Sequence, residues 1–151
     1  MKAVVDASVV VKWVFPASAA EEDTDRALSL LQGIRAGKIT LLQPPHWLAE
    51  VAAVVTRLHP EVVETALDLL DAMDFPITRD LPSLKKASQL AQDLNHHLFD
   101  TLYHAVALEH GYTLVTADDR YFRKARSLGW ILRLARWNGL AQHEDAVQAE
   151  S

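Results

Sequence analysis

The chain has 151 residues, of which 50% are hydrophobic and 23% charged, and its formal net charge at pH 7 is −5. That is enough apolar material for one globular domain over residues 1–151, and the acidic balance excludes a polycation that wraps nucleic acid by bulk attraction. The lack of cysteine excludes disulfides and thiolate zinc sites. No signal-peptide pattern or bilayer-length apolar run is visible, so we expect a cytoplasmic protein without a membrane partner.

A short buried strand is predicted over residues 3–5, where β-branched side chains run directly into Asp6. In an open parallel sheet, ligands bind at the carboxyl ends of the strands, so Asp6 lies where the functional sites of such proteins are found. The valine-rich segment after it is compatible with a strand or with a helix packed on the sheet. The alternative for Asp6 is a purely structural role as the N-cap of such a helix.

Helices and strands alternate along the middle of the chain. Apolar spacing predicts a helix capped by Thr24, a strand at 39–42 and a helix after Pro45 that contains Glu50. A further helix begins near Pro60. Residues 75–77 are predicted to form a weak third strand, and another helix begins at Pro82 with a turn after it.

The last part of the chain repeats the alternation. Residues 99–110 form a predicted helix that is apolar around most of its circumference, which indicates a central position, and Asp100 lies in its first turn. A fourth strand at 112–115 is followed by Asp118 and Asp119, a helix at 120–128 and a fifth strand at 130–134. This order predicts an α/β domain with a largely parallel sheet.

Four acids occupy special places in this scheme. Asp6 and Asp118 each follow a strand and precede a helix, so both lie at one edge of the sheet, while Glu50 and Asp100 come from helices. Each acid alone fits a structural role as a cap, a dipole partner or part of a solvated stripe. Together in one crevice they would repel one another, and such a cluster normally persists because divalent cations neutralise it.

The chemistry expected of such a cluster follows from its ligand atoms. Ligands that are all oxygen point to Mg²⁺ or Mn²⁺ rather than to zinc or copper. These ions clamp phosphate oxygens, activate a water and stabilise the leaving oxygen. The sequence therefore predicts metal-dependent hydrolysis of a phosphate ester.

Four motifs resemble a known family. VVDASVVVKW at the start, PPHWLAEV around Glu50, FDTLYHAVA around Asp100 and LVTADDRYF around Asp118 together resemble the PIN-domain ribonucleases, and more closely the VapC-type toxins of toxin-antitoxin pairs. The match runs over about residues 1–130. Four motifs in the right order are far more specific than any one of them.

The resemblance implies a three-layer α/β/α fold with a five-stranded, mainly parallel sheet. It also implies an acidic pocket that binds Mg²⁺ or Mn²⁺, endonucleolytic cleavage of RNA, a homodimer, and inhibition by a small antitoxin protein. Carried over by position, the family's catalytic, metal-binding acids match these four residues: Asp6, Glu50, Asp100 and Asp118.

Residues beside the pocket follow from the same resemblance. Ser8 and Thr116 match the family's small hydroxyl residues, which bind metal water or hold a carboxylate. Asp118 is favoured over Asp119 as the fourth acid because it lies two residues after the hydroxyl. Asp119 stays an alternative, as a ligand or as the cap of the next helix.

Other functions stay open at this point. His96 and His104 each stand four residues from Asp100, which is compatible with a histidine-assisted metal site. A signalling receiver domain is disfavoured, because it needs neighbouring acids after the first strand and Ala7 and Ser8 stand there. The remaining alternative is a non-catalytic module of the same fold that binds RNA or protein.

Two further features allow two interpretations each. A cluster of arginine and lysine residues over 120–136 contains no acid, so it either holds phosphates or forms a solvated surface. Trp13 and Trp47 either stack on bases or belong to the core. The tail from about residue 138 carries no functional signal.

Overall fold

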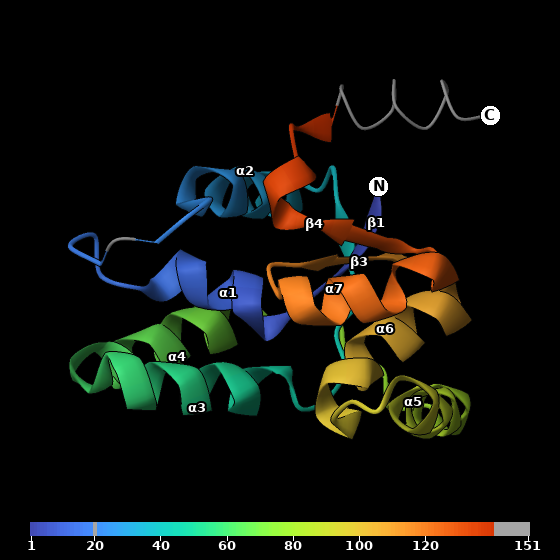
Figure 1. The fold of residues 1–151 in the computed structure, drawn as a ribbon. Helices are drawn as coiled ribbons and strands as arrows, with labels where there is room; N and C mark the ends of the chain where they lie inside the picture. Colours follow the sequence, from blue (N-terminus) through green and yellow to red (C-terminus); the bar gives the residue numbers. More distant parts are fainter. Residues whose placement is uncertain (20, 141–151) are drawn as a thin grey trace.

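The computed structural model describes residues 1–19 and 21–140. Four parallel strands form one sheet in the order β2-β1-β3-β4 (Figure 1). Their bounds are Lys2–Val5 for β1, Thr40–Leu41 for β2, Thr113–Thr116 for β3 and Ile131–Arg133 for β4. The chain moves from β1 to one side for β2 and to the other side for β3, so the order reverses between β1 and β3. Ligands bind at such a reversal in open α/β sheets.

The expectation of five strands is wrong, because the predicted third strand at 75–77 contributes only an isolated parallel bridge between Gln43 and Ile77. The Gln43 N–H donates to the Pro76 carbonyl at 2.9 Å, and the Thr78 N–H donates to the Gln43 carbonyl at 3.0 Å. Proline has no N–H to continue a ladder, and on the facing segment Pro44 follows Gln43 directly. Pairing therefore stops after one residue on each side.

The side chain of Gln43 replaces the missing backbone partner of β1. The Val5 N–H donates to Gln43 Oε1, and Gln43 Nε2 donates to the Val5 carbonyl, both at 2.8 Å. Gln43 is fully buried. A buried polar group of this kind must be paired, and here the amide pairs the backbone of the residue that precedes Asp6. The end of β1 is thereby fixed in place.

The helices agree with the expected elements within a few residues, and the segment after Asp6 is helical. The helices are α1 (Ala7–Val14), α2 (Thr24–Arg35), α3 (Trp47–Leu58), α4 (Val63–Ala72), α5 (Leu81–Leu94), α6 (Leu98–His110) and α7 (Asp119–Ala125). Short 3₁₀ turns lie at Pro60–Val62, Arg126–Leu128 and Leu134–Arg136. No helix in the described part of the chain is long and apolar enough to cross a membrane.

The expected cap at Thr24 is wrong, since Thr24 is the first residue of α2 and Asp23 precedes it with φ +60°. The Thr24 hydroxyl donates instead to the Glu21 carbonyl at 3.1 Å. Asp23 makes no capping hydrogen bond with its side chain. The Thr24 hydroxyl therefore stabilises the turn before the helix and does not cap it.

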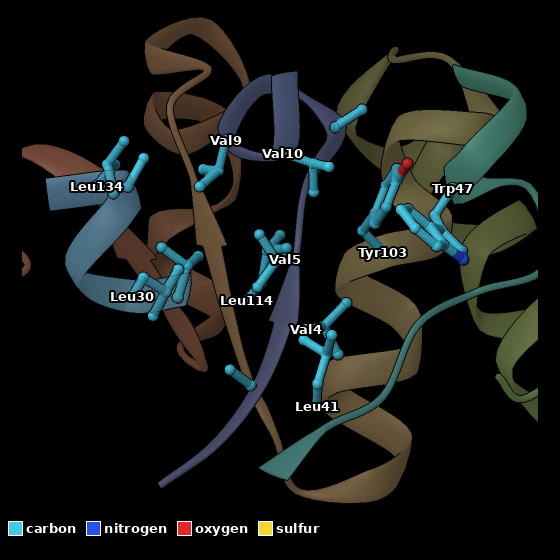
Figure 2. Packing of buried hydrophobic residues seen from close by; sticks show 14 of the residues in the cluster. Val4, Val5, Val9, Val10, Leu30, Leu41, Trp47, Tyr103, Leu114 and Leu134 are labelled. Carbon is cyan, nitrogen blue, oxygen red and sulfur yellow. The ribbon is translucent and has the colours of Figure 1, made fainter. Parts of the chain in front are cut away.

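Helices lie on both sides of the sheet, as the three-layer expectation required. Figure 2 shows Leu30 of α2 on one side of β1 and β3 and Tyr103 of α6 on the other. Tyr103 is fully buried and α6 contacts both β1 and β3, which confirms the central position expected of this helix. Trp47 is also buried in the core, and the Trp13 indole N–H donates to the Ala27 carbonyl at 2.8 Å. The interpretation of Trp47 as a base-stacking ring is wrong, because its ring is only 4% exposed.

Candidate active site

The four predicted acids line one cleft of about 450 Å³ at the carboxyl ends of β1 and β3. Asp6 follows β1 and Asp118 follows β3, whereas Glu50 projects from the first turn of α3 and Asp100 from the first turn of α6. The acids come from four segments that are far apart in the sequence. The fold thus brings them together where the strand order reverses.

Asp6 caps a helix and faces the cleft at the same time. Its carboxylate accepts the Ser8 N–H at 3.3 Å, a short hydrogen bond from the Ser8 hydroxyl, and one from the Thr116 hydroxyl at 3.2 Å. Burial raises the pKa of Asp6 to about 6, and the charges of Asp100 and Asp118 add to the rise, while the Ser8 bonds oppose it. Asp6 therefore caps α1 and still lines the cleft, so the structural role does not exclude the predicted functional one.

Ser8 and Thr116 join the ends of β1 and β3. The Ser8 hydroxyl donates to Asp6 and accepts the Ala117 N–H at 3.0 Å. The Thr116 hydroxyl likewise donates to Asp6 and accepts the Asp118 N–H at 3.0 Å. Both hydroxyls are thus oriented to hold a carboxylate, which is one of the two roles expected of them.

Glu50 is the second acid of the site whose pKa lies well above its usual range. Burial raises its pKa to about 7; the nearby Tyr103 hydroxyl acts against this rise, and the charges of Asp6 and Asp100 add to it. The Tyr103 hydroxyl is fully buried and makes no hydrogen bond of good geometry within the described residues. A carboxyl group that titrates near neutral pH is suited to proton transfer.

His46 stands one helical turn before Glu50 and fixes α3 against α6. Its Nε2 donates to the Phe99 carbonyl at 2.7 Å and lies 3.7 Å from Glu50 Oε1. Burial lowers the pKa of His46, so the ring is neutral near pH 7. This contact holds the backbone immediately before Asp100.

Asp100, Asp118 and His96 form the tightest group in the site. Their ligand atoms all lie within 4.8 Å of one another, and His96 Nε2 is 2.9 Å from Asp100 Oδ2. Asp118 also caps α7 by accepting the Tyr121 N–H at 3.0 Å. His96 and Asp100 are therefore in contact, as a histidine-assisted metal site would require.

His104 is not part of this group. Its Nδ1 shares a hydrogen bond of 2.9 Å with the Tyr121 hydroxyl, and its Nε2 donates to the Gly129 carbonyl at 2.9 Å. The ring is fully buried, and burial lowers its pKa. The part of the histidine alternative that relied on His104 is therefore wrong.

Asp119 points away from the cleft. Its side chain is 68% exposed and lies 3.8 Å from Arg133 Nη1. Asp118 lines the cleft and Asp119 does not, so the geometry favours Asp118 as the fourth acid.

Members of the basic cluster over 120–136 differ in their surroundings. Arg133 stacks over the Phe122 ring at 4.9 Å, and Lys124 donates to the Asn95 carbonyl at 2.9 Å and approaches His96. Arg120 lines a small polar recess beside His96. The cluster therefore includes residues with structural partners as well as one that borders the site.

Sequence reasoning missed His46, Tyr103, Lys124 and Gln43 as residues that shape this region. One signal was present for the histidines, because His46 and His96 each stand four residues before a site acid, a spacing that brings side chains together on helices. Lys124 comes from a different helix, and no local pattern indicates its contact with His96.

A larger cleft of about 720 Å³ lies between α2, β2 and α4. Its lining is mostly apolar, and Arg35 and Asp74 are its only ionisable side chains in the described part of the chain. One base and one acid without a shared partner do not make a reaction centre. The acidic cleft is therefore the candidate site.

The acidic cleft fits a divalent cation. Its carboxylates supply oxygen ligands of the kind that Mg²⁺ and Mn²⁺ prefer. Burial raises the pKa values of Asp6 and Glu50 and the neighbouring acids add to the rise, so the charged forms of both groups are disfavoured in the protein alone. A cation of charge +2 would remove that penalty.

Comparison with known proteins gives one family and several solved structures of similar fold. The family model described as the PIN domain matches residues 3–128. No curated protein matches the chain. Three solved structures illustrate the similarity of fold.

The first is VapBC2 from Rickettsia felis bound to a promoter DNA fragment, at 17% identity over 88% of this chain and 97% of that chain, with a TM-score of 0.62. FitAcB from Neisseria gonorrhoeae is 17% identical over 89% of this chain and 99% of that one, with a TM-score of 0.59. A toxin-antitoxin complex from Klebsiella pneumoniae is 15% identical over 87% and 97%, with a TM-score of 0.57. At these identities the likeness concerns the fold.

Proposed function

Because this chain belongs to the PIN-domain family, we propose that it is a Mg²⁺- or Mn²⁺-dependent endoribonuclease and the toxin of a toxin-antitoxin pair. One observation carries the proposal: four carboxylates from four separate segments line a single cleft at the reversal of strand order. A structural role for each acid separately does not explain why all four meet there.

Asp6, Asp100, Asp118 and Glu50 would hold the metal. When bound, a divalent cation supplies a Lewis acid for phosphate oxygens and lowers the pKa of a water ligand. Ser8 and Thr116 keep the Asp6 carboxylate oriented through their hydroxyl groups. With a cation bound, Glu50 would be ionised, and a carboxylate oxygen left free by the cation could accept a proton from the attacking water.

The proposal extends to partners of the protein. Solved structures with a similar fold include toxin-antitoxin complexes, which supports a small antitoxin protein as a partner of this chain. A homodimer and an RNA substrate follow from the resemblance of the motifs to VapC-type toxins. Under this proposal the antitoxin keeps the nuclease silent until it is removed.

The direct test is cleavage of total cellular RNA by the purified protein, free of any partner, in Mn²⁺, in Mg²⁺ and in chelator. Asp6→Asn is run beside the wild type, and Asp119→Asn serves as the matched control because Asp119 lies outside the cleft. We expect discrete fragments that require metal and Asp6 and persist in the control. A folded protein that cuts nothing would instead be a binding module.

A further inference from the structure

A chain of three side chains runs from α7 to the acidic cleft. Lys124 Nζ lies 3.2 Å from His96 Nδ1, and His96 Nε2 lies 2.9 Å from Asp100 Oδ2. Lys124 Nζ also donates to the Asn95 carbonyl at 2.9 Å, which fixes the ammonium group next to the imidazole. The chain joins three separate parts of the fold, namely α7, the turn before α6 and α6 itself.

The donors and acceptors in this chain fix the position of the imidazole proton. An ammonium group has only donors, so His96 Nδ1 must be the unprotonated acceptor. The single ring proton of a neutral imidazole then lies on Nε2, where it faces a carboxylate oxygen that can only accept. Both contacts require the same tautomer, with a proton on Nε2 and none on Nδ1.

The surroundings of His96 hold the ring in place. Its side chain is only 7% exposed, whereas that of Asp100 is 34% exposed and reaches the cleft. The buried Tyr121 ring packs edge-on against the imidazole, with ring centroids 5.0 Å apart. The hydrogen bond to Asp100 therefore has little freedom to change direction.

We propose that His96 is a positioning residue that orients the Asp100 carboxylate through its Nε2–H, and that Lys124 keeps Nδ1 as an acceptor by donating to it. The hydrogen bond ties Oδ2 of Asp100 and leaves Oδ1 for a cation in the cleft. His96 is then a partner of a ligand and not itself a ligand, because its Nε2 carries the proton and its Nδ1 accepts from Lys124. Outer partners of this kind tune metal affinity by orienting the ligand.

This interpretation contrasts with the direct alternative. The ligand atoms of His96, Asp100 and Asp118 lie close enough to share a metal ion. Coordination by His96 would require loss of the Nε2 proton and of the hydrogen bond to Asp100. The two arrangements differ in the tautomer and in whether a bound metal touches nitrogen.

The first experiment reads the tautomer in the metal-free protein, so it does not depend on the proposed function. Nitrogen NMR of protein labelled in its seven histidines, with the His96 signals identified by their loss in His96→Gln, should show a bare Nδ1 and a protonated Nε2. Lys124→Met should shift the Nδ1 signal, because that nitrogen loses its donor while Nε2 still faces Asp100. Lys85→Met, a change at an exposed lysine of α5, should leave the signals unchanged. A proton on Nδ1 in the wild type would overturn the proposal.

The second experiment measures Mn²⁺ affinity by calorimetry and rests on the proposed metal site. His96→Leu should weaken binding by about 10- to 100-fold, whereas His96→Gln, whose amide can still donate to Asp100, should recover most of the affinity. His97→Asn is the matched control, since the exposed neighbour makes no capping bond. Equal affinity in wild type and His96→Leu would contradict a positioning role.

Pulsed electron spin resonance of the bound Mn²⁺ separates the two arrangements. We expect no coupling from a directly coordinated imidazole nitrogen. Such a coupling in the wild type, lost in His96→Leu, would make His96 a ligand and overturn the proposal. If the wild type takes up no Mn²⁺, the proposed function fails, and the tautomer still decides the role of Lys124 and His96.

Discussion

Two aspartates of this protein share the same local chemistry and differ in their surroundings. Asp6 caps α1 and accepts hydrogen bonds from the backbone and hydroxyl of Ser8 and from Thr116. Asp80 caps α5 and accepts from the backbone and hydroxyl of Ser83, from the Thr78 hydroxyl at 2.8 Å and from His110 Nε2 at 2.9 Å. Each cap therefore combines a serine and a threonine.

The pKa values of the two carboxyl groups move in opposite directions. Burial acts to raise the pKa of Asp80, but hydrogen bonds from His110, Thr78 and Ser83 outweigh it and lower the pKa well below its usual range. At Asp6 burial prevails, and two neighbouring acids raise the pKa further to about 6. A helix cap and a cleft carboxylate are therefore compatible roles for one residue, and burial together with the nearby acids distinguishes Asp6 from Asp80.

The largest expected difference between the two caps is in activity. Asp6→Asn should lower metal-dependent RNA cleavage by at least about 100-fold, because it removes a proposed metal ligand worth several kcal/mol of transition-state stabilisation. Asp80→Asn should leave the cleavage rate unchanged. Initial rates of both folded variants on one RNA provide the measurement, and equal losses would remove the distinction.

Thermal stability of the metal-free proteins should change with opposite signs. The Asp80 charge is stabilised in the fold, so Asp80→Asn should cost about 1 kcal/mol. The Asp6 charge is disfavoured, so Asp6→Asn should raise stability by a similar amount, or about 2–4 °C in melting temperature for a chain of 151 residues. Melting curves in chelator at pH 7.5 test this, and two shifts of the same sign would contradict the comparison.

Lowering the pH should separate the two effects further. The Asp6 carboxyl has a folded pKa of about 6, raised from 3.8, so its penalty is full above pH 6 and disappears as the pH falls to about 4. The gain from Asp6→Asn should therefore shrink over this range. The lowered pKa of Asp80 keeps its contribution constant there. The difference between Asp6→Asn and the wild type at each pH removes the titration of groups remote from Asp6, and a gain from Asp6→Asn that persists at pH 4 would be inconsistent with burial of the charge.

The smallest effect is expected at Asp119, which has the same residue type as Asp118 and lies outside the cleft. Asp119→Asn should change stability by less than about 0.5 kcal/mol, because its side chain is 68% exposed and its pair with Arg133 is long. Its RNA cleavage should match the wild type. Loss of cleavage in Asp119→Asn with retention in Asp118→Asn would reverse the assignment of the fourth acid.

The sequence predicted much of this architecture because its signals are local. Short β-branched runs that end in Asp6 or lead to Asp118 identify two adjacent strands, and helical spacing places Glu50 and Asp100 near helix starts. The order of these elements leaves few topologies. Convergence of the acids then follows from the position of β1 next to β3, and their catalytic and metal-binding roles stay predictions.

Contacts between distant segments could not be predicted in the same way. Gln43 lies in an ordinary apolar run. Its side chain pairs with the backbone of Val5 because the neighbouring segment leaves β1 at Pro44, and no local pattern indicates this. Residues 75–77 have the composition of a strand but form only one β-bridge, between Ile77 and Gln43, within the described residues. The link from Lys124 to His96 joins residues that are 28 positions apart, and it depends on how α7 packs.

The central claim is that the acidic cleft holds a divalent cation, and a Mn²⁺ titration followed by calorimetry tests it most directly. Wild type and Asp80→Asn should bind Mn²⁺ with the same affinity, while Asp6→Asn should bind at least about tenfold more weakly because a carboxylate ligand is lost. Mn²⁺ binding that is equal in wild type and Asp6→Asn, or absent from the wild type, would contradict the account.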